Sequence, residues 1–236
     1  MSGLDITKHK IHLSNILLRV YKDSLLSSSL AFKGGTAAMM FYQLPRFSVD
    51  LDFDLVGIAD PTKIAKRVNR LVADTFEVVD QSAKYHTLFW LLSYGSGLSK
   101  IKLEINMRDV SLNTYEMKPY YGVNVKVMGR ADMVAHKLVT ILERKKLANR
   151  DLFDAHYFLS GEEADQINTR IIEQRTGMTA SEFFERLIFY IKEVDNKKIL
   201  NGLGEVLTEG QKDWVKAKLL VELVGLLTRA RDQYLS

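Results

Sequence analysis

The sequence predicts an α+β fold, in which strands and helices are mixed in the first half and helices alone make up the second. Several runs between residues 48 and 128 alternate apolar and polar side chains, the pattern of half-buried strands. From residue 129 to the end, apolar residues recur at helical spacing instead. We therefore expect a mixed-sheet core over residues 1–128, followed by a helical bundle over residues 129–236. No flexible linker separates these parts, so the helical region is expected to pack on the core.

The composition is that of a globular protein that buries a real core. Of the 236 residues, 47% are hydrophobic and 26% are charged, and the apolar runs are too short to span a bilayer. No secretory signal is recognised at the N-terminus. The absence of cysteine excludes disulfides and thiolate metal sites and suits a cytoplasmic location. The net charge of +4 is compatible with a nucleic-acid partner without requiring one.

Periodicity and turn residues define the expected elements of the first part. A helix over 5–27 and a short strand over 28–32 precede Gly34 and Gly35, and Thr36 is a predicted N-cap. The remaining elements of this part, in order, are a helix over 37–44, a strand over 48–57, a helix over 61–75, strands over 76–81, 86–94 and 100–107, a loop over 113–122, and a strand over 123–128.

Four helices are expected in the second part. Their predicted ranges are 130–147, 150–160, 180–194 and 209–235. Asn149 is a predicted N-cap of the second of these helices.

Three aspartates stand at alternate positions of the predicted strand over 48–57. Asp50, Asp52 and Asp54 share one face of this strand. Neighbouring carboxylates on one face are about 6.5–7 Å apart and repel by roughly 2 kcal/mol at an effective dielectric near 20. Either the aspartates defend an exposed edge strand, or they hold a divalent cation.

Further residues extend the cation hypothesis to a site for phosphoryl transfer. Glu104 lies on the polar face of the strand over 100–107 and could supply a third carboxylate, although a surface glutamate is the alternative. Paired divalent cations can stabilise the attacking and leaving oxygens of a phosphoryl displacement. Gly34 and Gly35 allow positive φ, and the helix after them presents free N–H groups to a phosphate. A tight turn without a ligand is the simpler reading of the two glycines.

The segment "KGGTAAMMFYQLPRFSVDLDF" resembles the signature of nucleotidyltransferases with the polymerase-β-type minimal fold. Together with "AHKLVTILERKKLANRDLFDAHYFL", it resembles the AbiEii/AbiGii toxin family, which includes the MenT toxins. The resemblance covers roughly residues 30–160. It implies a nucleotidyltransferase mixed sheet with flanking helices, followed by the helical bundle.

The resemblance also implies roles for individual residues. Asp50 and Asp52 match the acid pair that holds the metal, and Glu104 stands where the family often has aspartate. The residues that would bind the nucleotide are Lys33, Gly34, Gly35, Thr36, Arg46, Ser48 and Lys137.

Lys137 and Asp151 are the candidate catalytic residues of the helical part. Lys137 lies at the edge of its helix's apolar stripe, from which its ammonium could reach nucleotide phosphates, while a solvated lysine is the alternative. Asp151 and Asp154 share a helix face and match the "R-D-x-x-D" that begins at Arg150. The resemblance implies that Asp151 acts on the acceptor, although an acid in a first helical turn is favoured by the helix dipole alone.

The resemblance implies an enzyme that transfers an NMP from an NTP to an acceptor hydroxyl, with Mg²⁺ or Mn²⁺ as cofactor and pyrophosphate as product. The expected acceptor is the 3′ end of tRNA, and the toxin role implies a cognate antitoxin. Two alternatives remain. One is an antibiotic- or protein-modifying nucleotidyltransferase outside toxin biology, and the other is a non-catalytic binding protein on the same fold.

Overall fold

The computed structural model describes residues 5–95, 99–161 and 166–234. The chain forms two compact units, residues 1–129 and residues 130–236. We call them the N-terminal unit and the C-terminal unit. Among the described residues, no helix is both long and apolar enough to cross a membrane.

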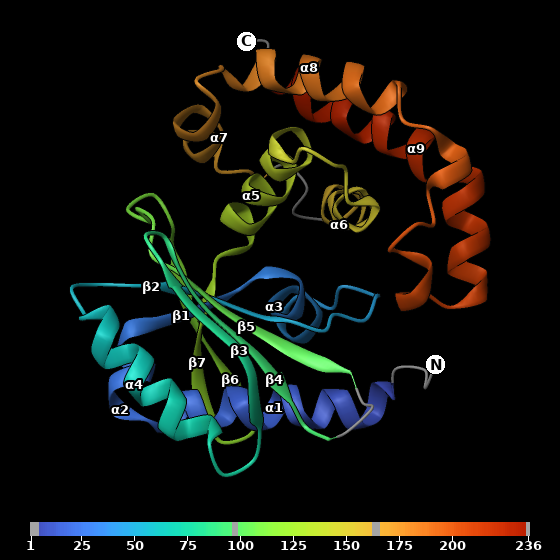
Figure 1. The fold of residues 1–236 in the computed structure, drawn as a ribbon. Coiled ribbons are helices and arrows are strands. Elements are labelled where there is room, and N and C mark those ends of the chain that lie inside the picture. The colour runs from blue at the N-terminus through green and yellow to red at the C-terminus, as the bar shows by residue number, and fades with distance from the viewer. Residues whose placement is uncertain (1–4, 96–98, 162–165, 235–236) are drawn as a thin grey trace. The chain divides into compact units, whose positions relative to one another are not determined.

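A seven-stranded mixed sheet is the centre of the N-terminal unit (Figure 1). Its strand order is β3-β4-β5-β2-β1-β7-β6. The central strand β2 is antiparallel to β1 and parallel to β5, and β1 is parallel to β7. The strands are β1 (Leu30–Lys33), β2 (Leu51–Leu55), β3 (Glu77–Lys84), β4 (Thr87–Ser93), β5 (Lys100–Asn106), β6 (Tyr115–Tyr120) and β7 (Val123–Met128).

In the described part of this unit, four helices flank the sheet. Figure 1 draws α1, α2 and α4 along one side of the sheet and α3 on the other. Their bounds are α1 (Ile6–Lys22), α2 (Ser24–Ser29), α3 (Gly34–Phe41) and α4 (Pro61–Val72). The expected single helix over 5–27 is wrong, because Asp23 ends α1 in an extended conformation and caps α2 by accepting hydrogen bonds from two of its first N–H groups.

The strand alternation places an apolar face against the helices. Leu51 and Phe53 of β2 are fully buried and stand beside Leu103 and Ile105 of β5 in the register. The polar residues between them therefore face the other way, and Asp52 among them lies against Gly34, the first residue of α3. This alternation gathers the acidic residues of β2 and β5 on one face.

Two local predictions are wrong for identifiable reasons. The expected loop over 113–122 contains strand β6, which forms a hairpin with β7 through Tyr121 and Gly122, both at positive φ. Its Pro119 is tolerated because β6 is the last strand of the sheet. Thr36 is not an N-cap, because α3 already begins at Gly34 and Thr36 lies inside it.

The C-terminal unit consists of helices. The α-helices are α5 (Arg130–Glu143), α6 (Asn149–Leu159), α7 (Thr169–Thr176), α8 (Ala180–Lys192) and α9 (Glu209–Asp232), and two short 3₁₀ helices, η1 (Asn196–Lys198) and η2 (Gly204–Val206), connect α8 to α9. Helix α9 packs against α6 and α8. Capping boxes fix the starts of α8 and α9, formed by Thr179 with Glu182 and by Thr208 with Gln211. Helix α7 was not predicted. It is short, and its two buried residues, Ile171 and Ile172, are too few to give a helical apolar pattern.

Candidate active site

The double glycine forms the turn from β1 into α3. Gly34 has φ +78°, and a Cβ added to it would lie 3.0 Å from Asp52 Cβ and closer still to the Asp52 carboxylate. A Cβ on Gly35 would lie 2.8 Å from Ser48 Oγ and 3.0 Å from Arg46 Nη2. Each glycine therefore lies against polar side chains that the sequence assigned to the same site, and a side chain at either position would displace them.

Asp52 and Glu104 are cross-strand neighbours. They pair in the register of the parallel strands β2 and β5, and both are half-buried. Residues that pair across adjacent strands point to the same face of the sheet, at neighbouring positions. Glu104 therefore lies beside Asp52, as the proposed cation site requires.

The main chain around Asp50 is held on both sides by side chains from helices. Thr36 Oγ1 donates a hydrogen bond to the Asp50 carbonyl, and His9 Nε2 donates to the Val49 carbonyl at 2.9 Å. Both carbonyls precede β2, which begins at Leu51. Side chains here donate the hydrogen bonds that a neighbouring strand would otherwise supply. Thr36 is fully buried in this role. Its hydroxyl therefore fixes the backbone at Asp50.

His9 is a fully buried residue of α1 and is not one of the predicted site residues. Nε2 donates to the Val49 carbonyl, and in the neutral ring Nδ1 then accepts from the Tyr94 hydroxyl, 2.9 Å away. Burial lowers the pKa of His9, while the Val49 carbonyl and the Asp50 charge oppose this shift. No motif marks His9, since its partners come from segments far apart in the sequence.

Arg46 and Ser48 lie in the segment between α3 and β2. Both are buried, and Arg46 Nη1 donates to the Phe47 carbonyl at 3.1 Å. The remainder of the guanidinium reaches Gly35, where Nη2 borders the space above the glycine. The arrangement brings a cation and a hydroxyl to the start of α3, where main-chain N–H groups also point outward.

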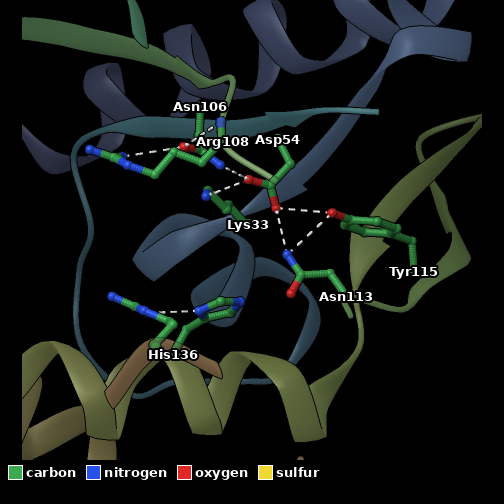
Figure 2. A network of polar contacts seen from close by, with 8 residues as sticks. Lys33, Asp54, Asn106, Arg108, Asn113, Tyr115 and His136 are labelled. Atoms are coloured by element: carbon green, nitrogen blue, oxygen red, sulfur yellow. Dashed lines mark hydrogen bonds and ion pairs between the residues drawn. The ribbon is translucent and has the colours of Figure 1, made fainter. Parts of the chain in front are cut away.

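Asp54 has a different environment from Asp50 and Asp52, because it is fully buried and the Lys33 ammonium balances its charge (Figure 2). Its Oδ1 lies 2.5 Å from Lys33 Nζ and accepts from Asn106 Nδ2 at 2.7 Å. Its Oδ2 accepts from Asn113 Nδ2 at 3.2 Å and from the Tyr115 hydroxyl at 3.1 Å. The carboxylate therefore ties β1, β2, β5 and the start of β6 together. Three aspartates on one face thus include one structural member.

A divalent cation fits this site only with ligands added by a substrate. Within residues 5–95, 99–161 and 166–234, no three His, Cys, Asp or Glu side chains are grouped so as to hold a metal ion. The neighbouring carboxylates of Asp52 and Glu104 provide the kind of oxygen ligands that Mg²⁺ takes, and Mg²⁺ in such sites uses one or two carboxylates, several waters and substrate phosphates. The donor set is compatible with a cation that enters together with a nucleotide.

Lys137 of α5 is bound to two buried acids of α6 in the C-terminal unit. Its Nζ lies 2.7 Å from Asp154 Oδ2 and 3.4 Å from Asp151 Oδ1. Arg144 Nε lies 2.9 Å from Asp151 Oδ2, although this oxygen accepts no hydrogen bond from any described residue. The contact with Arg144 is therefore an ion pair whose N–H does not point at the oxygen.

This cluster changes the local interpretation of the two predicted residues. Lys137 is not a solvated lysine, because only 15% of its side chain is exposed. Asp151 lies in the first turn of α6, as expected, but the helix begins one residue before the predicted start, so that Asn149 is its first residue and not its N-cap. Asn149 instead donates to the Lys198 and Asn201 carbonyls.

The sequence signals for the remaining site residues were weak. Asn106 alternates with the buried residues of β5 and so faces the same side as Glu104, but no sequence signal points to its partner Asp54. Asn113 and Tyr115 fell in the segment taken for a loop. Only the fold brings them to Asp54.

Comparisons with known proteins connect this arrangement to a family. The family model described as nucleotidyl transferase AbiEii toxin, type IV TA system, matches residues 15–221. The solved structure of JHP933 from Helicobacter pylori is similar, with a TM-score of 0.64, 18% identity, and coverage of 99% of this chain and 95% of that chain. A second H. pylori protein, described as a candidate nucleotidyltransferase, has a TM-score of 0.64 and 20% identity, and covers 99% of this chain and 97% of its own. A comparison with curated proteins found no match.

At these identities the two H. pylori structures establish the fold alone, a mixed sheet with flanking helices followed by further helices, as the sequence predicted. The family match extends over most of the chain, including the double glycine, the acidic strand β2, Glu104 and the Lys137 cluster. The chain belongs to the AbiEii family of nucleotidyltransferase toxins.

Proposed function

We propose that the N-terminal unit binds an NTP at the Gly34–Gly35 turn and transfers its NMP to an acceptor hydroxyl, with release of pyrophosphate. The contact of Gly34 with the Asp52 carboxylate supports this site more than any other observation. It leaves no room for a side chain where the main chain would meet a phosphate, and it sets an acid at the same point. The neighbouring Gly35 has the same relation to Arg46 and Ser48.

The residues have separate roles in this proposal. Main-chain N–H groups at Gly34 and Gly35 and the Arg46 guanidinium would bind phosphate oxygens, and Ser48 would donate a further hydrogen bond. Lys33 is engaged by Asp54, so it would contribute positive charge at the edge of the site and not a flexible contact. Thr36 would act by fixing the main chain of Asp50.

Asp50, Asp52 and Glu104 would hold Mg²⁺, or Mn²⁺, together with the phosphates of the NTP. The bound cation would neutralise phosphate charge and polarise the phosphoryl group. In the transfer itself, the acceptor oxygen forms a bond to the α-phosphorus, the bond to the bridging oxygen of pyrophosphate breaks, and the acceptor proton passes to a base or to solvent. Positioning and charge neutralisation are the main contributions of the protein.

Lys137 and Asp151 complete the proposed set of catalytic residues. The Lys137 ammonium is fixed in place by two carboxylates, so it would contribute a positioned positive charge toward the nucleotide phosphates, as Lys33 would. Asp151 is itself buried and ion-paired. We therefore assign it first to the positioning of Lys137, and only second to proton removal from the acceptor.

The type IV toxin–antitoxin description of the family supports a toxin role with a cognate antitoxin protein and a cytoplasmic location, where NTPs and RNA are available. The proposed acceptor is the 3′ end of tRNA. The labelling experiment described next would also identify a protein acceptor or the enzyme's own chain, and a small molecule such as an antibiotic is tested by adding it in place of tRNA.

Labelling tests the proposal directly. Each of the four α-labelled NTPs is incubated with the protein and Mg²⁺, alone and with total tRNA or a protein fraction. Label that appears in tRNA with wild type, and is lost with Asp52→Asn, is the expected result. The matched control is Asp213→Asn, since Asp213 is an exposed aspartate of α9. Growth arrest on expression of wild type, but not of Asp52→Asn, would support the toxin role. Absence of label in every fraction with either Mg²⁺ or Mn²⁺ would contradict transferase activity.

A further inference from the structure

The C-terminal unit contains a cavity that the proposed NTP site does not use. It has a volume of about 680 Å³ and lies among the connection from α5 to α6, the start of α6, the end of α8, and the segment with η1 and η2. Every residue that lines it belongs to the C-terminal unit. Small-molecule sites have volumes of about 300–1,000 Å³, so the cavity could hold a ligand of nucleotide size.

The half-buried part of the cavity wall combines one cation, one aromatic ring and an apolar surface. Arg150 and Tyr190 are half-buried there, next to Leu147, Ala148 and Val194. Among the residues that the structure describes, none forms a hydrogen bond or an ion pair with Arg150. A partly desolvated guanidinium that lacks a counter-ion gains free energy when an anion binds to it.

Hydrogen bonds and an ion pair hold the wall of the cavity in place. Asn149 Nδ2 donates to the carbonyls of Lys198 at 2.7 Å and Asn201 at 3.2 Å, which fixes the start of α6 to the segment opposite. Asp195 accepts from the Lys197 N–H at 3.0 Å and lies 3.5 Å from the Lys198 ammonium. A cavity held in this way orders few groups when a ligand binds, which lowers the entropic cost of binding.

The exposed rim restricts the charge of the ligand. Lys146 would add to the attraction of Arg150 for an anion, and Lys198 also lines the rim, where its ammonium lies 3.5 Å from the Asp195 carboxylate. Glu193 and Glu205 are two further exposed carboxylates of the rim besides Asp195. These carboxylates would repel a polyanion such as a triphosphate, and they would accept hydrogen bonds from hydroxyl or amino groups. The fitting ligand therefore has a single phosphate, several donors and a flat ring for Tyr190.

We propose that this cavity binds a nucleoside monophosphate unit. Its phosphate binds Arg150, its base lies against Tyr190, and its ribose hydroxyls or amino group donate to the rim carboxylates. The unit is either a free nucleotide or the end of an RNA strand. The choice of a nucleotide over other aromatic anions rests on the proposed function, whereas the anion site itself rests on the cavity and Arg150.

Calorimetric titration of the full chain with AMP, CMP, GMP and UMP tests this inference. The titrations are made in EDTA and repeated with Asp52→Asn, so that the proposed NTP site contributes nothing. We expect at least one NMP to bind under both conditions. Arg150→Gln should weaken it about tenfold or more, and Tyr190→Leu about fivefold or more. Arg186→Gln, which alters an exposed arginine of α8, is the matched control and should change nothing. Thermal unfolding checks that each variant is folded.

Comparison ligands define the chemistry. Inorganic phosphate and the nucleosides alone should bind more weakly than the NMP, and the NTP should gain nothing over it. A short oligoribonucleotide that competes with the NMP identifies an RNA end as the source, whereas an oligoribonucleotide that fails to compete identifies the free nucleotide.

Three results would overturn the inference. They are the absence of NMP binding, binding that Arg150→Gln leaves unchanged, and phosphate binding as tight as that of the NMP. NMP binding that requires Mg²⁺ and Asp52 would belong to the N-terminal unit, and would refute this site while leaving the proposed function intact. Conversely, Arg150-dependent binding by a protein without transferase activity would keep the cavity site and refute the proposed function.

Discussion

Gly34 and Asp52 are in direct contact, and the contact requires that residue 34 have no side chain. The glycine has φ +78°, and an added Cβ would lie 3.0 Å from Asp52 Cβ and closer to its carboxylate. Two separate constraints thus meet at one residue, namely the left-handed backbone and the lack of space. The first is shared with other glycines of the chain, whereas the second is specific to the candidate site.

Gly34→Ala should therefore cost more stability than an alanine at a glycine with the same backbone. Gly57 is the matched control, since it has φ +76° and nothing within 4 Å of an added Cβ. We expect Gly57→Ala to cost about 1–2 kcal/mol in free energy of unfolding. Gly34→Ala should cost about 1–3 kcal/mol more and abolish labelling of the acceptor. Urea unfolding and the transferase assay measure the two effects. Equal costs at the two positions would show that Asp52 moves aside freely.

Asp54 should contribute to stability and not to chemistry. Asp54→Asn removes the counter-charge of Lys33, whose side chain remains only 25% exposed. Loss of one partner from a buried ion pair costs about 3–5 kcal/mol, and the partial exposure of Lys33 places our expectation near the lower end, at about 3 kcal/mol. The variant Lys33→Met/Asp54→Asn should lose less than the sum of the two single variants, because they interact directly. Additive losses in unfolding experiments would argue against the ion pair.

Asp54 also shows where sequence reasoning stops. Asp50, Asp52 and Asp54 have the same alternation, so nothing in the local pattern distinguishes a buried acceptor from residues facing a site. Asp54 is distinguished by its contacts with Asn113 and Tyr115. Both residues lie in the segment over 113–122, which its proline and tyrosines led us to predict as a loop. By contrast, Gly34, Asp52 and Glu104 could be predicted together. The double glycine follows a strand, and alternation fixes which face each acid takes once β2 and β5 are neighbours.

The Lys137 cluster shows the same limit. The sequence placed Lys137 at the edge of an apolar stripe and put Asp151 and Asp154 on one helix face. It could not show that these residues meet, because contacts between two helices depend on how the helices pack. His9 is a further example, because its bond to the Val49 carbonyl depends on the docking of α1 against the segment before β2.

His9 should make stability and activity sensitive to mild acid. Because burial lowers its folded pKa below the ordinary value of 6.5, the unfolded chain binds more protons just below that pH. The stabilisation is present above pH 6.5 and is lost as the pH falls toward the folded pKa, with a slope of at most about 1.4 kcal/mol per pH unit from this residue. The pKa values of His12 and His156 are lowered as well, so the wild-type slope combines all three.

His9→Gln should reduce this slope, and urea unfolding at several pH values between 7.5 and 5 measures it. His9 holds the Val49 carbonyl and contacts the Tyr94 hydroxyl, and Val49 directly precedes Asp50. Loss of these bonds should displace Asp50, so the variant should also raise the Mg²⁺ concentration needed for half-maximal labelling. His86→Gln, at an exposed position, is the control. An unchanged slope and an unchanged Mg²⁺ requirement would both speak against the assigned role of His9.

Glu104 should be distinguishable from Asp52 by the effect of conservative changes. Asp52→Asn should lower the rate of labelling at least about 100-fold, because it removes a charge at the site of charge neutralisation. Glu104→Asp keeps the charge in register with Asp52 but shortens the side chain, so the rate at saturating Mg²⁺ should fall by less than about tenfold while more Mg²⁺ is required. Glu104→Gln should resemble Asp52→Asn. Removal of divalent cations with EDTA should stop labelling by wild type. A Glu104→Gln variant with wild-type labelling would place the third ligand elsewhere.

The structural and catalytic roles of Lys137 should separate in a pair of variants. Lys137→Met leaves Asp154 buried without the ammonium 2.7 Å away, whereas Asp151 retains its ion pair with Arg144. We expect a loss of about 3 kcal/mol or more in unfolding free energy, chiefly through Asp154. Lys137→Met/Asp154→Asn removes the buried carboxylate charge at position 154 and should recover part of that loss. If the ammonium also binds nucleotide phosphates, labelling should stay absent in the double variant despite its recovered stability. Recovery of labelling together with stability would show that Lys137 serves only to neutralise the two acids.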